Sequence, residues 1–153
     1  MFKRILIAYN SPVSGRNALL TSRDIAALTK ADIHLVAVVG LPIINMFLTE
    51  GLFLDEEFNE KKKYAQAILD EGTSQMMELG LGVTGHLAFG EPVEEICRIA
   101  LSAGCDLIVL GDAPKRVSFA ERWGNASVGK SLLEHSPCPV LIAKPIIANS
   151  SSA

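Results

Sequence analysis

The fold is decided by residues 106–145, whose sequence is DLIVLGDAPKRVSFAERWGNASVGKSLLEHSPCPVLIAKP. Asp106–Gly111 is a short apolar run that stops at a glycine, as expected of a strand buried on both faces of a parallel sheet. A polar loop with basic residues follows, and Gly124 then opens a helical segment. Because the unpaired N–H groups and positive dipole end of a helix start favour anions, this stretch predicts an anion site beside a buried strand.

The segments before and within this stretch alternate between strand and helix. Strands are predicted over residues 4–9, 32–40, 82–89, 106–110 and 139–143. Helices are predicted over residues 14–30, 55–79, the segment that follows Gly90-Glu91-Pro92, and 127–135. This strict alternation predicts an α/β fold with an open, doubly wound, five-stranded parallel sheet flanked by helices. Ligands of such sheets bind outside the carboxyl ends of the strands, where Tyr9-Asn10, Val38–Gly40 and Gly111 would meet.

Length and composition predict one ordinary globular domain. The chain has 153 residues, of which 49% are hydrophobic and 20% charged, and this is enough for a single core. We expect the domain to span residues 1–147 and residues 148–153 to form a flexible tail. The net charge of −3 gives no general attraction for nucleic acid or an anionic membrane. The longest uncharged stretch, residues 35–49, is shorter than the roughly 20 residues of a membrane-spanning helix.

Two features predict that the protein is cytoplasmic. Met1–Arg4 leads into a short apolar run and then polar residues, which does not match a secretory signal. The three cysteines, Cys97, Cys105 and Cys138, share no metal-ligand spacing and are typical of small buried residues in a reducing compartment. The three histidines likewise show no spacing that would assemble a metal site or a catalytic triad.

Residues Leu41–Leu54 are apolar but contain Pro42 and Gly51, which predicts a long loop. The apolar side chains of such a loop must be shielded from water, and three alternatives stay open: the loop packs on the sheet edge, closes as a lid, or binds a protein partner. The helix after it carries one apolar stripe, made of Phe58, Ala65, Leu69, Gly72, Met76 and Leu79. Glu57 stands four residues before Lys61, so the run Lys61–Lys63 is interpreted as a solvated helix face.

Gly124–Ser131 matches the Walker A pattern, in which backbone N–H groups cradle phosphates and a lysine contacts them. A phosphate loop of that class leaves a strand directly, whereas residues 118–123 are charged and unlike a strand. If the helix begins near Gly124, then Gly129 and Lys130 lie inside it and cannot wrap a phosphate. The segment Asn125–Gly129 also approaches the nucleophile elbow G-x-S-x-G, but its first glycine is missing and no strand precedes it.

Three segments together resemble a known family, the universal stress proteins. RILIAYNSPVSGRNAL (residues 4–19) looks like the first strand and helix of that family, Gly90-Glu91-Pro92 is similar to its turn after the third strand, and HSPCPVLIAK (residues 135–144) looks like its closing strand. The order of elements matches over essentially the whole chain. The resemblance implies the strand order 3-2-1-4-5 and a homodimer formed through the last strand, Pro139–Ala143, whose apolar edge would otherwise be exposed.

Members of this family that bind ATP carry a glycine, two residues, a second glycine, nine residues, a third glycine, and then serine or threonine. Here the spacing is kept by Gly111, Pro114, Gly124 and Asn125. Proline has no N–H to offer a phosphate, whereas asparagine can still cap a helix and donate a hydrogen bond. The family's aspartate after the first strand corresponds to Asn10, and this change removes a charged acceptor.

The resemblance implies a set of nucleotide-binding residues, namely Ala8, Asn10, Val38, Gly111, Pro114, Gly124, Asn125, Ala126 and Ser127. Val38 falls where the family's backbone contacts the adenine edge, and Ala126 and Ser127 fall on the triphosphate side. The expected ligand is ATP or another adenine nucleotide, accompanied by Mg²⁺. The three departures from the motif predict weak binding.

These observations favour a cytoplasmic universal stress protein that acts in the stress response by conformation or association. No residue is placed as a general base, so no catalytic role is expected, although slow ATP hydrolysis stays open. The alternative is a nucleotide-independent homodimeric interaction module of the same fold, with Leu41–Leu54 as its partner surface. A phosphate-loop ATPase is favoured only by the pattern at Gly124–Ser131, and nucleic acid is not an expected partner.

Overall fold

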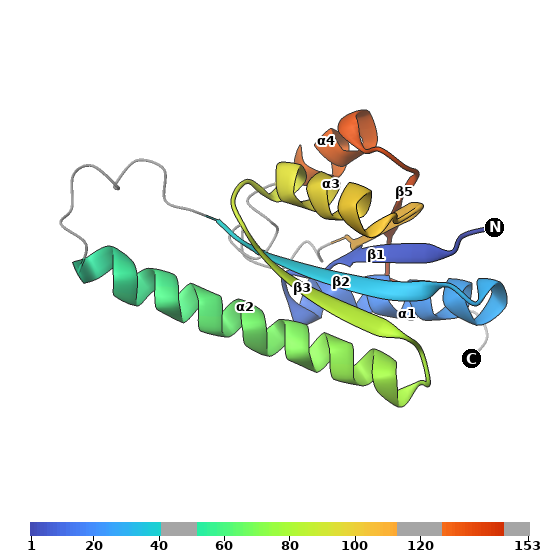
Figure 1. The fold of residues 1–153 in the computed structure, drawn as a ribbon, viewed down its shortest axis with the longest axis horizontal. Helices are drawn as coiled ribbons and strands as arrows, with labels where there is room; N and C mark the ends of the chain where they lie inside the picture. Colours follow the sequence, from blue (N-terminus) through green and yellow to red (C-terminus); the bar gives the residue numbers. More distant parts are fainter. Residues whose placement is uncertain (41–51, 113–126, 146–153) are drawn as a thin grey trace, which may run out of the picture.

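A computed structural model describes residues 1–40, 52–112 and 127–145 of the chain. The strands within these residues are β1 (Arg4–Ala8), β2 (Asp32–Val39), β3 (Val83–Phe89), β4 (Leu107–Gly111) and β5 (Val140–Ala143). The helices are α1 (Pro12–Thr29), α2 (Leu52–Glu78), α3 (Pro92–Ala103) and α4 (Ser127–His135). Strands and helices alternate along the chain as the sequence predicts (Figure 1).

The strands form one parallel sheet in the order β3-β2-β1-β4-β5, which confirms the predicted topology. In the centre of the sheet, Ile7 of β1 pairs with Leu35 of β2 on one side and with Val109 of β4 on the other. All three residues are fully buried. Continuous apolar runs such as Ile5–Ala8 are buried throughout because helices cover both faces of the sheet.

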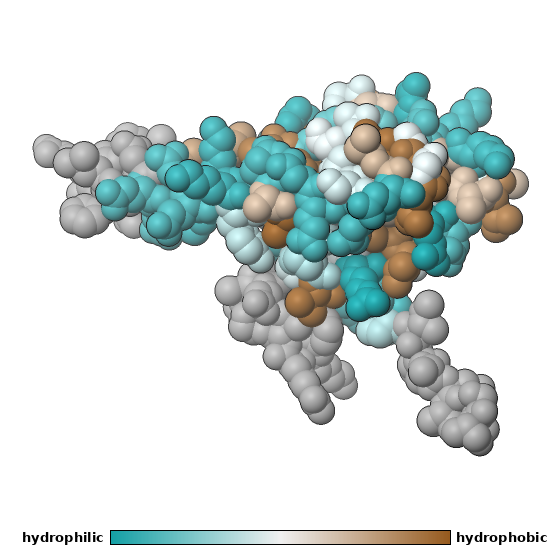
Figure 2. All heavy atoms as spheres, turned by 90° about the horizontal axis from the view of Figure 1, so that it is seen from below, coloured by the Kyte–Doolittle hydropathy of each residue, from teal (hydrophilic) through white to brown (hydrophobic). Residues whose placement is uncertain are grey.

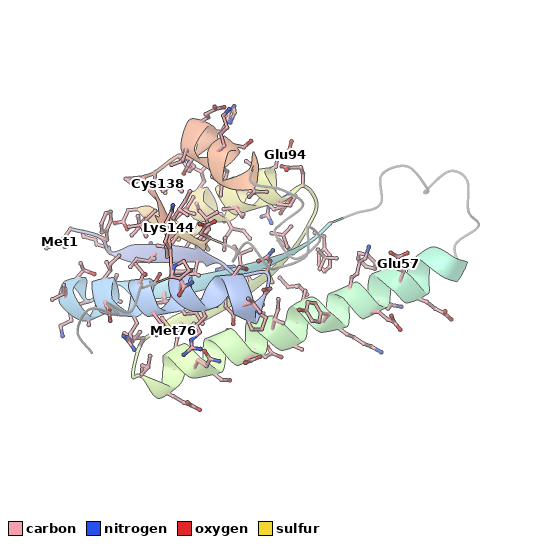
Figure 3. The ribbon with its side chains drawn as sticks, turned by 180° about the vertical axis from the view of Figure 1, so that it is seen from behind. Met1, Glu57, Met76, Glu94, Cys138 and Lys144 are labelled. Atoms are coloured by element: carbon pink, nitrogen blue, oxygen red, sulfur yellow. The ribbon has the colours of Figure 1, made fainter. Side chains whose placement is uncertain are left out.

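The helices form two layers, one on each face of the sheet. α1 and α2 pack on one face, and α3 and α4 pack on the other (Figure 1). Met76 of α2 and Glu94 of α3 mark the two layers on opposite sides of the ribbon (Figure 3). Each layer closes its own apolar cluster, so the sheet separates two cores.

Polar groups fix the ends of the first strand and of the helices beside it. The Asp106 carboxylate accepts backbone N–H bonds from Lys3 and Arg4 at 2.9–3.1 Å and so joins the starts of β1 and β4. Burial raises the pKa of Asp106, but these N–H bonds outweigh it and hold the pKa below its ordinary value. Ser11 caps α1, and Gly104 ends α3 at a φ of 68°, a backbone conformation that glycine adopts without strain.

Helix α2 differs from the prediction at both ends. It begins at Leu52, so the last three residues of the expected Leu41–Leu54 loop are helical; residues 41–51 lie outside the described part of the chain. At the other end the helix stops at Glu78, and Leu79 is exposed instead of completing the apolar stripe. The first part of α2 extends beyond the sheet (Figure 1), and from Glu56 onward its surface is mainly hydrophilic (Figure 2). Within the described residues, no helix combines the length and apolar character that a membrane span requires.

Candidate functional site

The carboxyl ends of β1, β2 and β4 meet at one edge of the sheet, with β1 in the middle. Ala8, the last residue of β1, is buried and pairs with Val36 of β2 and Leu110 of β4. The next residue, Tyr9, still donates its backbone N–H to the Val36 carbonyl at 2.8 Å. Asn10 therefore emerges beyond the sheet at the point where a ligand of a doubly wound fold is expected.

The first turn of α1 holds the Asn10 side chain in place. Ser11 Oγ accepts hydrogen bonds from the N–H groups of Val13 and Ser14 at 3.1 and 3.3 Å, which starts the helix directly after Asn10. Ser14 Oγ donates to Asn10 Oδ1 at 3.0 Å. This bond uses one of the two lone pairs of the side-chain oxygen, so the Asn10 amide keeps both an acceptor and its NH₂ donors for a ligand.

A cavity of about 280 Å³ opens at the end of β2 and brings Asn10 and Val38 together. Val38 lines it from β2, Gly40 from the position directly after that strand, and Pro92 from the start of α3. Apolar walls with a few polar groups are typical of small-molecule sites. Two of the residues that the sequence predicts for nucleotide binding, Asn10 and Val38, thus share one cavity.

The opposite wall of this cavity comes from α2 and was not anticipated from the sequence. Lys61, Tyr64, Ala65 and Ile68 line it, at the spacing of one helix face. Lys61 was predicted on a solvated face, and its ammonium does form the expected ion pair with Glu57 at 2.9 Å. Lys61 stands three residues before Tyr64 and four before Ala65, so all three lie on one side of the helix. Tyr64 is exposed and Ala65 is buried, so Lys61 lies at the border of the apolar face. This spacing is the sequence signal that could have placed Lys61 at the cavity.

Gly111, the first glycine of the nucleotide motif, lies where β4 ends against the start of α1. It pairs with Ala143 of β5, and a side-chain carbon at this position would overlap the backbone carbonyl of Ser14. The glycine is therefore required by backbone packing, whatever the ligand. This close approach also brings the end of β4 next to the turn that carries Asn10.

The phosphate side of the predicted site lies mostly outside the described residues. Pro114, Gly124, Asn125 and Ala126 fall there, and Ser127 is the first residue of α4, its side chain also outside the described part. The four residues at the sheet edge, Ala8, Asn10, Val38 and Gly111, are therefore the part of the site whose geometry is defined.

Helix α4 includes the last five residues of the Walker-like segment Gly124–Ser131. The helix spans Ser127–His135, so Gly129 and Lys130 lie inside it and cannot wrap a phosphate, as expected from the sequence. A side-chain carbon on Gly129 would lie 3.3 Å from Ile142 Cδ1, so the small residue permits close packing of α4 on β5. The helix therefore does not support a Walker-type phosphate loop at this segment.

The other polar residues considered from the sequence do not line this cavity. Asp24 forms an exposed ion pair with Arg23, and Cys97, Cys105 and Cys138 are free thiols that are buried or half-buried. Burial raises the pKa of each thiol, that of Cys105 to about 11, so these cysteines are protonated thiols rather than thiolate nucleophiles near pH 7. Within the described ranges, no three metal-ligating side chains come together.

Comparisons with known proteins place this geometry in context. The family model described as Universal stress protein family matches residues 1–144. The chain is 28% identical to universal stress protein YxiE of Bacillus subtilis (strain 168) over 150 residues, which cover 94% of this chain and 100% of YxiE.

Solved structures agree with this match. A universal stress protein family structure from Burkholderia pseudomallei is 27% identical, with a TM-score of 0.72 over 92% of this chain and 94% of that one. A family protein from Arabidopsis thaliana, solved with AMP bound, shares the fold at 18% identity, with a TM-score of 0.68 over 98% of this chain and 94% of that one. The chain belongs to the universal stress protein family.

Proposed function

We propose that this universal stress protein binds an adenine nucleotide weakly at the carboxyl end of its sheet and acts through conformation or association rather than turnover. The observation that carries the proposal is the cavity that joins Asn10 and Val38 at the end of β2. The AMP that is bound in the Arabidopsis relative of the same fold supports this class of ligand.

The cavity offers the contacts that an adenosine needs. The Val38 backbone supplies donors and acceptors for the adenine edge, Tyr64 supplies an aromatic wall, and the Asn10 side-chain oxygen accepts hydrogen bonds from the sugar hydroxyls. The phosphates would extend toward the N-terminal end of α4, which begins at Ser127, directly after Gly124, Asn125 and Ala126 in the sequence. Pro114 belongs to the same motif, and Mg²⁺ would neutralise part of the phosphate charge. Weak binding follows from two losses: Pro114 has no N–H to donate, and Asn10 carries no charge.

Titration calorimetry with ATP and Mg²⁺ tests this proposal. We expect saturable binding in the wild type, about 5-fold tighter binding in Asn10→Asp because a charged acceptor adds about 1 kcal/mol, and loss of binding in Gly124→Val. Lys130→Ala is the matched control, since Lys130 is exposed inside α4 and should not contact the ligand. No heat and no thermal shift at millimolar ATP in wild type and Asn10→Asp would overturn the proposal.

A second candidate, a homodimeric interaction module that works without nucleotide, is favoured by β5. This strand is at the edge of the sheet, and its apolar residues Val140, Leu141 and Ile142 are only partly buried, with Ile142 36% exposed. An apolar edge strand is protected when a second copy covers it. Sedimentation analysis tests this: we expect a dimer in the wild type and a monomer in Ile142→Lys. A wild-type monomer would exclude the module.

A further inference from the structure

Two of the three histidines meet on neighbouring strands, although the sequence gives no sign of a common site. His34 Nδ1 of β2 and His86 Nε2 of β3 lie 2.9 Å apart. Their ring centres are 5.2 Å apart, and their ring planes lie within 17° of parallel. In the register of the two strands, His34 pairs with Thr84 and Val36 with His86, so the histidines are diagonal neighbours on one face.

Both imidazoles are held on a rigid part of the fold and are still reachable from solvent. Val36 and Ala88, each two residues further along its strand, are buried in the cluster under α3, so the histidines lie on the same face of the sheet. Each histidine is half-buried. The paired backbones of β2 and β3 fix the separation of the two Cα atoms, while the exposed part of each ring leaves an entry path.

The surroundings keep the two rings neutral near pH 7. Burial lowers the pKa of both histidines, and the charge of Arg4 adds to this for His34 while His34 itself and Arg98 add to it for His86. The Asp32 carboxylate acts in the opposite direction on His34. Neutral imidazole is the form that binds metal ions.

The positive neighbours are themselves engaged. Arg98 on α3 donates to the Glu95 carboxylate at 2.6 and 2.9 Å, and Arg4 Nη1 donates to the Ala103 carbonyl at 3.2 Å. The ion pair offsets the charge of Arg98, and the bond to Ala103 directs the Arg4 guanidinium toward the end of α3. The charge of Arg4 remains and opposes a cation, so binding depends on coordination by both ring nitrogens.

We propose that His34 and His86 form a two-histidine site for a divalent transition-metal ion that prefers ligands at right angles, such as Ni²⁺ or Cu²⁺. When an ion lies about 2.05 Å from each of two nitrogens that are 2.9 Å apart, the N–metal–N angle is about 90°. Tetrahedral Zn²⁺, which prefers about 109°, would need a separation of about 3.3 Å. The square-planar or octahedral ion therefore requires the rings only to turn, whereas Zn²⁺ would also require the two nitrogens to move apart.

Binding replaces the hydrogen bond between the two rings. The imidazole that donates it moves its proton to its other ring nitrogen, both rings turn so that their lone pairs meet at the ion, and no net proton is released from the neutral pair. Water fills the remaining coordination positions. The site does not depend on nucleotide binding, because it lies on the α3 face of β2 and β3 rather than in the cavity.

Calorimetric titration of untagged protein with NiCl₂ near neutral pH tests the site. Ni²⁺ is the better probe because Cu²⁺ oxidises thiols and the chain has three free cysteines. We expect one saturable site whose affinity falls at least 10-fold in His34→Gln and in His86→Gln. The double variant should bind Ni²⁺ no more weakly than either single variant, because the loss of one histidine already removes the chelate.

His135→Gln is the matched control, since His135 is exposed on α4 and its Nδ1 contacts the Ser131 carbonyl at 3.0 Å. It should bind Ni²⁺ like the wild type. A measurement on the wild type alone guards against variants that fail to fold: Ni²⁺ should broaden the NMR signals of His34 and His86 before those of His135. Absence of saturable binding, or equal affinity in His34→Gln and the wild type, would overturn the proposal.

Discussion

The two faces of the sheet are packed in different ways. On the α1–α2 face, backbones approach closely: the buried Tyr9 ring lies between Gly15 of α1 and Gly72 of α2, and Gly111 lies against the Ser14 carbonyl. On the α3–α4 face the helices pack through ordinary apolar side chains, which are Ile96, Ile99, Ala100 and Leu132. At Gly15, Gly72 and Gly111 the first face has no room for an added methyl group, whereas the second face accommodates half-buried polar groups, including the two neighbouring histidines.

This difference indicates where the fold tolerates substitutions and side-chain rearrangements. The nucleotide cavity borders the closely packed α1–α2 face, because Asn10 follows Tyr9 and precedes the first turn of α1. Rigid glycine contacts fix the position of that turn, so the cavity keeps its shape without a ligand. The pair His34 and His86 relies instead on strand register alone, and its side chains are free to exchange a hydrogen bond for another partner.

The largest effect is expected from Gly111→Ala. The added carbon would overlap the Ser14 carbonyl, a backbone atom that cannot move away without shifting α1, and we expect a loss of about 4 kcal/mol in the free energy of unfolding. Gly40→Ala is the control, because a side-chain carbon there meets no described residue within 4 Å and should change stability by no more than about 0.5 kcal/mol. Urea unfolding measures both, and equal stability of the two variants would contradict the close packing of this face.

A smaller loss is expected from Gly15→Ala. Its added carbon would overlap the Tyr9 ring, which is rigid and cannot rotate away, and we expect a cost of about 3 kcal/mol. In a Tyr9→Val background the ring is gone, so the same substitution should cost nothing and should gain part of the helix preference of alanine. A double-mutant cycle by urea unfolding measures this coupling. Additive costs would show that the ring and the glycine do not interact.

The sheet was predictable because each strand is an apolar run bounded by turn residues, and because strict alternation with helices leaves few topologies. The start of α2 was not predictable. Leu52–Leu54 continue an apolar stretch that contains Pro42 and Gly51, so local sequence favours a loop, whereas the structure extends the helix to Leu52. A helix of this length gains its stability from packing further along, around Ala65 and Leu69.

The candidate site was predictable only in part, and the reason is again physical. Asn10 and Val38 follow strand ends, and strand ends of a parallel sheet meet at one edge. Lys61 and Tyr64 reach the cavity because of how α2 crosses the sheet, which no local pattern encodes. The meeting of His34 and His86 depends on the register between β2 and β3, and a shift by one residue would place them on opposite faces.

Tyr9, which is buried on the α1–α2 face, leads to a prediction about the pH dependence of stability. Burial, followed by the nearby Glu71 carboxylate, raises the pKa of Tyr9 to about 12 from an ordinary value of 10.0. The stability that comes from keeping the phenol neutral is therefore present below pH 10 and is lost as the pH rises through 12, with a loss of about 1 kcal/mol near pH 11. In Tyr64→Phe, Tyr9 is the only tyrosine left, and tyrosinate absorbance should appear only near pH 12. Tyrosinate at pH 10 would show that the ring is accessible to water.

The smallest effect is expected from Gly129→Ala, on the more open face. Alanine in a helix interior gains about 0.5–1 kcal/mol over glycine. The added carbon would lie 3.3 Å from Ile142 Cδ1, the end of a flexible and partly exposed side chain that can turn aside. We therefore expect a gain of no more than about 0.5 kcal/mol in urea unfolding and unchanged ATP binding by calorimetry. A phosphate loop at Gly124–Ser131 would instead lose nucleotide binding, because its second glycine would have to wrap the phosphate, so this one variant separates helix packing from phosphate recognition.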